Sequence, residues 1–162
     1  MRILGIDPGL QVCGYAALEA GLQGENLIEA GVIRTDRQLP LEEKLHRIAQ
    51  DMEALLNNLT PDVVAVEQLY AHYAHPRTAI LMGHARGVIL QCCAEHRIDV
   101  KSFSATKIKK ATTGNGRASK VQMQRAVQSL MSLPELPEPN DVADAIAVAL
   151  CCANNMKVEA GR

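Results

Sequence analysis

The chain of 162 residues has the length and composition of one ordinary globular domain. Apolar residues make up 48% of it and charged residues 22%, which excludes disordered, fibrous and membrane-spanning classes. The longest uncharged apolar stretch, 145–152, is far too short to cross a bilayer, and the N-terminus lacks the basic-then-apolar pattern of a signal peptide. We therefore expect a cytoplasmic protein with no membrane partner, built as one domain over 1–155 and a short tail over 156–162.

The first half of the chain is predicted to contain three consecutive strands, followed by a strand between two helices. Three short apolar runs joined by short connections predict an antiparallel meander of strands over 2–7, 13–20 and 26–34. An amphipathic helix follows over 40–59, because its leucine, isoleucine and methionine residues recur at helical spacing. A short strand over 62–67 then lies between that helix and another over 78–96, as expected of a central parallel strand.

The second half is mostly helical after a fifth predicted strand over 98–103. Ser104 suits the N-cap of a short helix, and a TTGNGR loop leads from it to a helix over 118–132. Asn140 is expected to cap a last helix, whose alanine-rich composition lets it lie close to a sheet. The order of elements predicts an α/β fold with a mixed five-stranded sheet, an antiparallel meander plus parallel strands, covered by helices on both faces.

Four carboxylates stand at the ends of these elements. Asp7 ends the first strand in the stretch IDPG, and Glu67 ends the fourth in VAVE. If these strands are parallel neighbours, both acids emerge at the edge where open α/β sheets bind ligands. Asp141 and Asp144 are three residues apart at the start of the last helix, and so lie on one face of it. Each acid taken alone has a plainer interpretation. Asp7 and Glu67 could be strand-end residues that face water, and Asp141 could simply start the helix.

Together the four acids predict a metal site. Clustered carboxylates repel one another, which raises their pKa values unless a cation neutralises them. Mg²⁺ is the natural partner because it binds carboxylate oxygens while keeping waters and accepting phosphate oxygens. Three or four acids make room for two ions roughly 4 Å apart, an arrangement that hydrolyses phosphodiesters. We therefore predict two Mg²⁺ ions per subunit, with Mn²⁺ as a substitute.

The net charge of −1 hides an uneven distribution of charge along the chain. Residues 77–125 carry ten Lys or Arg and two acids, whereas the rest of the chain carries seven Lys or Arg and sixteen acids. Charge alone leaves two interpretations of the basic block open, a solvated helix face or a surface for a polyanion. A phosphate backbone held beside an acidic metal site would need such a basic surface.

Five motifs occur in order along the chain: IDPGLxxxGYA, VAVEQLY, ARGV, TGNGRASK and DVADAIAVAL. Together they resemble RuvC-type Holliday junction resolvases over 2–153. The resemblance implies a ribonuclease H-like fold, a homodimer, and Mg²⁺-dependent symmetric nicking of two like-polarity strands at a four-way DNA junction, in homologous recombination and DNA repair. It also implies that the protein acts together with the branch-migration complex of RuvA and RuvB.

The resemblance further implies roles for single residues. The catalytic, metal-binding acids would be Asp7, Glu67, Asp141 and Asp144, although some family members carry histidine at the place of Asp141. Lys109 and Lys120 fall on basic positions near the scissile phosphate and would stabilise its charge. Tyr70 falls where the family usually has an aromatic side chain, which would stack on an unpaired base. The DNA-binding residues expected are Tyr70, Arg77, Lys107, Lys109, Lys110, Arg117 and Lys120.

Two other functions stay open on the residues. A nucleotide-binding module of the actin-like class also places an aspartate after its first strand, but such proteins build their cleft between two domains. ATP binding without junction cleavage would favour that module. A junction-binding protein without catalysis is disfavoured by the presence of all four acids, since a site that no longer works is free to lose them.

Overall fold

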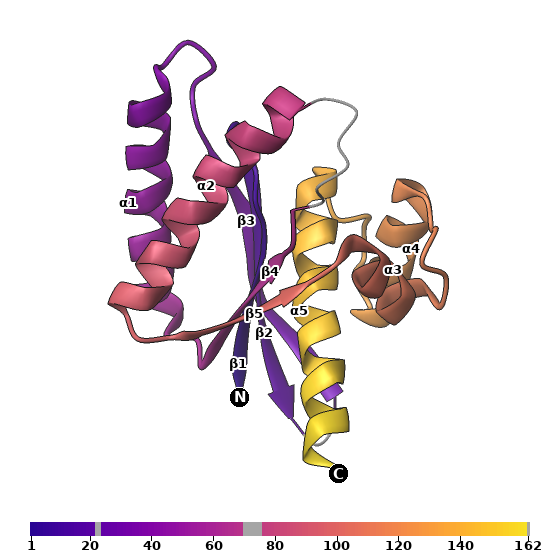
Figure 1. Ribbon diagram of the computed structural model, residues 1–162. Helices are drawn as coiled ribbons and strands as arrows, with labels where there is room; N and C mark the ends of the chain where they lie inside the picture. The colour runs from indigo at the N-terminus through magenta and orange to yellow at the C-terminus, as the bar shows by residue number, and fades with distance from the viewer. Residues whose placement is uncertain (22–23, 70–75, 162) are drawn as a thin grey trace.

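The computed structural model describes residues 1–21, 24–69 and 76–161, which form the ten elements expected from the sequence in the expected order. Figure 1 shows their arrangement. Among the described residues, no helix is both long enough and apolar enough to pass through a membrane. The elements are β1 (Arg2–Asp7), β2 (Val12–Gly21), β3 (Gly24–Arg34), α1 (Leu41–Leu59), β4 (Val63–Glu67), α2 (Pro76–Glu95), β5 (Asp99–Phe103), α3 (Ala105–Thr113), α4 (Lys120–Leu130) and α5 (Asn140–Ala160).

The five strands form one mixed sheet in the order β3-β2-β1-β4-β5. Strands β1, β2 and β3 pair antiparallel, while β4 pairs parallel with both β1 and β5. The prediction of a meander plus parallel strands is thus confirmed. Ile6 of β1 lies beside Val66 of β4, so the two strands reach their carboxyl ends together, at Asp7 and Glu67.

Helices cover both faces of the sheet, as predicted. Figure 1 shows α1 and α2 against one face and α5 against the other, with α3 and α4 together to the right of α5. Successive residues of a strand point to opposite faces, so each strand contributes to two cores. Leu4 and Ile6 of β1 belong to the core beneath α1 and α2, whereas Ile3 belongs to the core beneath α5.

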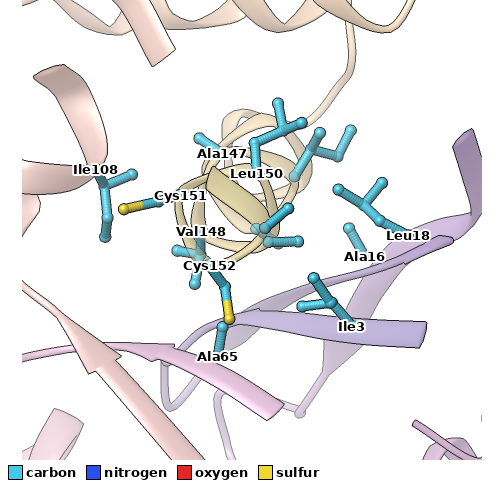
Figure 2. Packing of buried hydrophobic residues seen from close by; sticks show 14 of the residues in the cluster. Ile3, Ala16, Leu18, Ala65, Ile108, Ala147, Val148, Leu150, Cys151 and Cys152 are labelled. Atoms are coloured by element: carbon cyan, nitrogen blue, oxygen red, sulfur yellow. The ribbon is translucent and has the colours of Figure 1, made fainter. Parts of the chain in front are cut away.

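Helix α5 is buried over most of its length, because every residue from Ala145 to Ala153 is inaccessible or nearly so. Figure 2 shows Cys152 pointing toward Ala65 of β4, while Cys151 points toward Ile108 of α3. The helix therefore fills the space between the sheet and α3. Small side chains on α5 permit this close fit, as the composition predicted.

Both ends of α5 differ from the sequence prediction. Asn140 is the first residue of the helix and Pro139 occupies the N-cap position, with no side chain capping the helix. The backbone N–H of Val142 donates to the carbonyl of Pro139, so the backbone makes the first turn without an asparagine cap. At its other end the helix continues to Ala160, so the stretch expected as a tail continues the helix.

The last turns of α5 are tied to the sheet. Asn155 donates from its side-chain amide to the carboxylate of Glu159 at 2.6 Å, and Lys101 of β5 donates to the same carboxylate at 2.8 Å. These contacts give a physical reason for the helix to run past Asn155.

Candidate active site

Three of the four predicted acids line one cleft at the carboxyl edge of the sheet. Asp7 ends β1, Glu67 ends β4, and Asp144 lies near the start of α5. They line a cavity of about 270 Å³, together with Ala105, Ile108 and Lys109 of α3 and Lys120 and Met123 of α4. Strand pairing thus brings together two acids that are 60 residues apart, and α5 adds the third.

Two glycines determine how closely α5 approaches these acids. A Cβ atom at Gly5 of β1 would collide with the backbone carbonyl of Ala145, and one at Gly14 of β2 would collide with that of Asp141. Gly14 is also the pairing partner of Asp7. The start of α5 therefore lies directly over the end of β1, which brings its aspartates to the cleft.

Asp141 occupies the first turn of α5 but is not part of the cleft lining. Its carboxylate nevertheless acts on the cleft through its charge, because it raises the pKa values of both Asp7 and Asp144. The structure thus separates three acids that line the cavity from a fourth beside it.

Burial and mutual repulsion disfavour the charged forms of these acids. The pKa of Asp7 is raised from 3.8 to about 8, mainly by burial and in smaller part by the charges of Asp144, Glu67 and Asp141. Burial and the charge of Asp144 also raise the pKa of Glu67. Burial raises the pKa of Asp144 against the opposing effects of Lys120 and Lys109. A cation in the cleft would relieve this repulsion.

The chemistry of the cleft fits a hard divalent cation. Its described lining offers carboxylate oxygens and includes no histidine or cysteine. Over residues 1–21, 24–69 and 76–161, no three acidic, histidine or cysteine side chains converge as a ready-made cage for an ion. Mg²⁺ commonly takes only one or two carboxylates, with waters and substrate phosphates as its remaining ligands. Asp7, Glu67 and Asp144 of the lining could therefore serve as ligands of such a cation.

Two lysines complete the cleft. Lys109 lies on α3, and Lys120 is the first residue of α4. A capping box fixes that start, because the Ser119 hydroxyl accepts from the backbone N–H of Gln122 while the Gln122 side chain accepts from that of Ser119. Lys120 lowers the pKa of Asp7, and Lys109 lowers that of Glu67, so their positive charges act directly on the acids.

The loop between α3 and α4 is shaped by its own hydrogen bonds. Gly114 ends α3 with a φ of 76°, a conformation that favours glycine. The side chain of Asn115 accepts from the backbone N–H of Arg117 at 3.0 Å. Arg117 itself is exposed, which leaves its side chain accessible beside the cleft helices.

Four other predicted DNA contacts are among the described residues, Arg77, Lys107, Lys110 and Arg117, and none of them lines the cleft. Arg77 at the start of α2 and Lys110 on α3 are exposed. Lys107 also has partners inside the domain, since its ammonium donates to Asn155 at 2.6 Å and lies 5.0 Å from the centre of the Phe103 ring. Tyr70 falls outside the described residues. These DNA contacts stay predictions.

One arginine near the cleft was missed by the sequence analysis. Arg86 of α2 donates to the backbone carbonyl of Glu67 and to the hydroxyl of Ser102, at 3.3 Å and 2.9 Å respectively. Its only signal in the sequence was its place in the ARGV motif.

The chain is similar to known nucleases over almost all of its length. The family model described as crossover junction endodeoxyribonuclease RuvC matches residues 3–152. A protein of that name from Rhodopirellula baltica is 47% identical over 94% of this chain and 88% of its own. Another, from Heliobacterium modesticaldum, is 42% identical over 96% of each chain.

Solved structures agree with this assignment. Thermus thermophilus RuvC in complex with a Holliday junction substrate superposes with a TM-score of 0.90, at 30% identity, over 98% of this chain and 96% of that one. The yeast mitochondrial Holliday junction resolvase shares the fold, with a TM-score of 0.68 at 14% identity over 96% of this chain and 80% of its own. The expected ribonuclease H-like fold is confirmed by these matches. The chain belongs to the RuvC family of crossover junction endodeoxyribonucleases.

Proposed function

We propose that this protein resolves Holliday junctions by metal-dependent, symmetric nicking of two DNA strands of like polarity, in homologous recombination and DNA repair. The observation that carries the proposal is the cleft in which Asp7, Glu67 and Asp144 face Lys109 and Lys120. Acids for a metal and lysines for a phosphate are the two parts that phosphodiester hydrolysis requires. The names of the relatives and the Thermus complex with a junction support this choice of substrate.

The four acids are the proposed metal ligands. Two Mg²⁺ ions per subunit would be held by Asp7, Glu67 and Asp144, with Asp141 beside them. Mn²⁺ would be able to replace Mg²⁺. Bound ions would supply an activated water and stabilise the leaving oxygen. The burial of Asp7 supports its place as a metal ligand, because a carboxylate with a pKa raised to about 8 ionises readily at neutral pH only beside a cation.

The lysines are the proposed partners of the scissile phosphate. Lys109 lines the cleft from α3 and Lys120 from α4, so a phosphate bound there would have a lysine on each of two helices beside it. They would stabilise the negative charge that develops on the phosphate oxygens during cleavage. Both also offset part of the repulsion among the acids.

Binding of the junction arms would use the other cations and one aromatic residue. We assign phosphate contacts to Arg77, Lys107, Lys110 and Arg117, and stacking on an unpaired base to Tyr70. Contacts of this kind make affinity strongly dependent on salt and nearly independent of sequence. Shape, with its two-fold symmetry, would distinguish a junction from ordinary duplex DNA.

A homodimer follows from the symmetry of the substrate. A four-way junction has two equivalent strands to cut, and a two-fold dimer presents two equivalent clefts to them. We propose that such a dimer of single nuclease domains acts in the cytoplasm together with the branch-migration complex of RuvA and RuvB.

A cleavage assay tests the proposal. Purified protein is incubated with a synthetic four-way junction or with linear duplex of the same sequence, in Mg²⁺, in Mn²⁺ or in EDTA, and the nicks are mapped on all strands. We expect paired nicks on two like-polarity strands of the junction, only with metal. Junction binding without nicks in either metal would overturn the proposal, and ATP binding without nicks would favour a nucleotide-binding module.

A further inference from the structure

Arg86 of α2 joins the ends of two neighbouring parallel strands. Its Nε atom donates to the backbone carbonyl of Glu67, the last residue of β4, at 3.3 Å. Its Nη2 atom donates to the hydroxyl of Ser102, next to the last residue of β5, at 2.9 Å. The arginine is half-buried, and one guanidinium thus connects a helix on one face of the sheet to two strand ends at the cleft.

We propose that Arg86 is a positioning residue for DNA cleavage, which fixes the ends of β4 and β5 and thereby the placement of Glu67 and of Lys109. This inference rests on the proposed nuclease function. It assigns to Arg86 no contact with DNA.

The contact reaches Glu67 through its backbone. The pKa of the Glu67 carboxyl is shifted by burial, by Asp144 and by Lys109, and Arg86 is not among these causes. The carboxylate therefore stays directed to the cleft that it lines, while its own peptide carbonyl is held from the other face of the sheet. An arginine that neutralised the carboxylate would instead compete with a metal for it.

The same strand ends are joined by two hydrogen bonds from Gln68. Its backbone N–H donates to the carbonyl of Phe103 at 2.9 Å, and its side-chain amide donates to the carbonyl of Ser102 at 3.3 Å. Arg86 adds the third connection and the only one of these that involves α2. The group as a whole fixes the point where β4 leaves the sheet.

The connection continues into the lysine side of the cleft. Directly after β5, Ser104 caps α3, with its hydroxyl accepting from the backbone N–H of Lys107 at 3.3 Å. Lys109 follows one turn into α3 and lines the cleft. A shift at Ser102 would therefore be passed through the start of α3 to Lys109, so Arg86 supports both an acid and a lysine.

Arginine suits this place because its planar fork offers several N–H groups with fixed directions, and two of them reach two different acceptors. Lysine would carry the charge but could only partly reproduce the bridge. Glutamine keeps a single donor nitrogen and loses both the positive charge and the guanidinium fork.

The test compares Arg86→Gln, Arg86→Lys and Ser102→Ala with wild type. Arg47→Gln serves as the control, because it removes an arginine that pairs with Asp51 on its own helix, α1. Single-turnover cleavage of a four-way junction in Mg²⁺ is measured beside the junction Kd in EDTA and the Tm. We expect Arg86→Gln to lower the cleavage rate by about 10- to 100-fold, as misplaced catalytic groups do, with a Kd within about twofold of wild type.

Two further results are expected. Arg86→Lys recovers part of the rate, and adding Ser102→Ala to Arg86→Gln costs little more, because the two residues act as one unit. Without DNA, Mn²⁺ raises the Tm of Arg86→Gln by less than it raises that of wild type, since Glu67 is less well placed as a ligand.

The inference is overturned if Arg86→Gln cleaves at the wild-type rate, or if its loss of rate is matched by an equal loss of junction affinity, which would make Arg86 a DNA contact. A large fall in the Tm of Arg86→Gln, together with no recovery of the cleavage rate in Arg86→Lys, would also overturn the inference. That result would indicate a role for Arg86 in folding. If wild type itself does not cleave, the proposed function fails and the inference with it.

Discussion

Gly14 of β2 lies directly against the backbone of Asp141 of α5, with no room for a Cβ atom between them. Gly14 pairs with Asp7, so this contact stacks the start of α5 on the end of β1. The distance between two of the proposed catalytic segments therefore depends on a residue that has no side chain.

Gly14→Ala tests the importance of that contact. The added methyl group would collide with the Asp141 carbonyl and push α5 away from β1, because backbone cannot yield as a flexible side chain can. Overpacking of this kind costs about 1–3 kcal/mol. We expect a lower Tm and a cleavage rate reduced more than junction binding. Gly87→Ala is the stability control, since a Cβ there meets nothing within 4 Å, and its Tm should equal or exceed that of wild type.

The raised pKa of Asp7 predicts how stability depends on pH without metal. Its pKa rises from 3.8 to about 8 on folding, so the folded protein binds more protons than the unfolded chain between these values. Stability in EDTA should therefore be highest near pH 4 and fall as the pH rises to about 8. The pKa values of Glu67 and Asp144 are raised too, which acts in the same direction. Urea unfolding across this range measures the slope.

Asp7→Asn should remove much of that slope, because the amide stays neutral at every pH in the range. In EDTA at pH 8 we expect the Tm of Asp7→Asn to exceed that of wild type by at least a few degrees. A change of about 1 kcal/mol in the free energy of unfolding shifts the Tm of a chain of this size by roughly 2–4 °C. Glu135→Gln, an exposed acid in the loop before α5, is the matched control. A wild-type slope of zero, or equal stabilisation by both variants, would contradict the proposed burial and repulsion of the acids.

Lys120→Ala should slow cleavage more than it weakens binding. Lys120 lines the cleft and would stabilise charge that develops only during reaction, so its loss should cost about 10²–10³-fold in single-turnover rate. Lys110→Ala, on the exposed side of α3, should do the opposite and weaken binding more than rate. Rates and Kd values at two salt concentrations separate these effects. Equal behaviour of the two variants would count against a catalytic role for Lys120.

Much of the fold could be predicted because local patterns determine it. The helical spacing of leucines in α1 and the short apolar runs of the strands each indicate an element by themselves. The proximity of Asp7 and Glu67 followed from one further step, the parallel pairing of the strands they end. The ends of the helices followed less directly from local patterns. Asn140 was expected to cap α5, but it is the first residue of the helix, because the backbone carbonyl of Pro139 accepts the first hydrogen bond.

What the sequence did not indicate depends on contacts between distant elements. Arg86 donates to residues 19 positions before it and 16 after it, and no local pattern encodes such a bridge. Asp141 and Asp144 share one predicted helix face, yet only Asp144 lines the cleft, and the spacing of the two acids does not show which of them enters it. The close approach of α5 to the sheet depends on Gly5 of β1 and Gly14 of β2, which lie far from α5 in the sequence.

The most direct measurement compares wild type and Asp7→Asn on the same four-way junction, with Mg²⁺ and with EDTA. If the acidic cleft performs the cleavage, wild type makes symmetric nicks only with Mg²⁺, and Asp7→Asn binds the junction with similar affinity but does not nick it. An Asp7→Asn protein that cleaves at the wild-type rate would contradict the account at its centre.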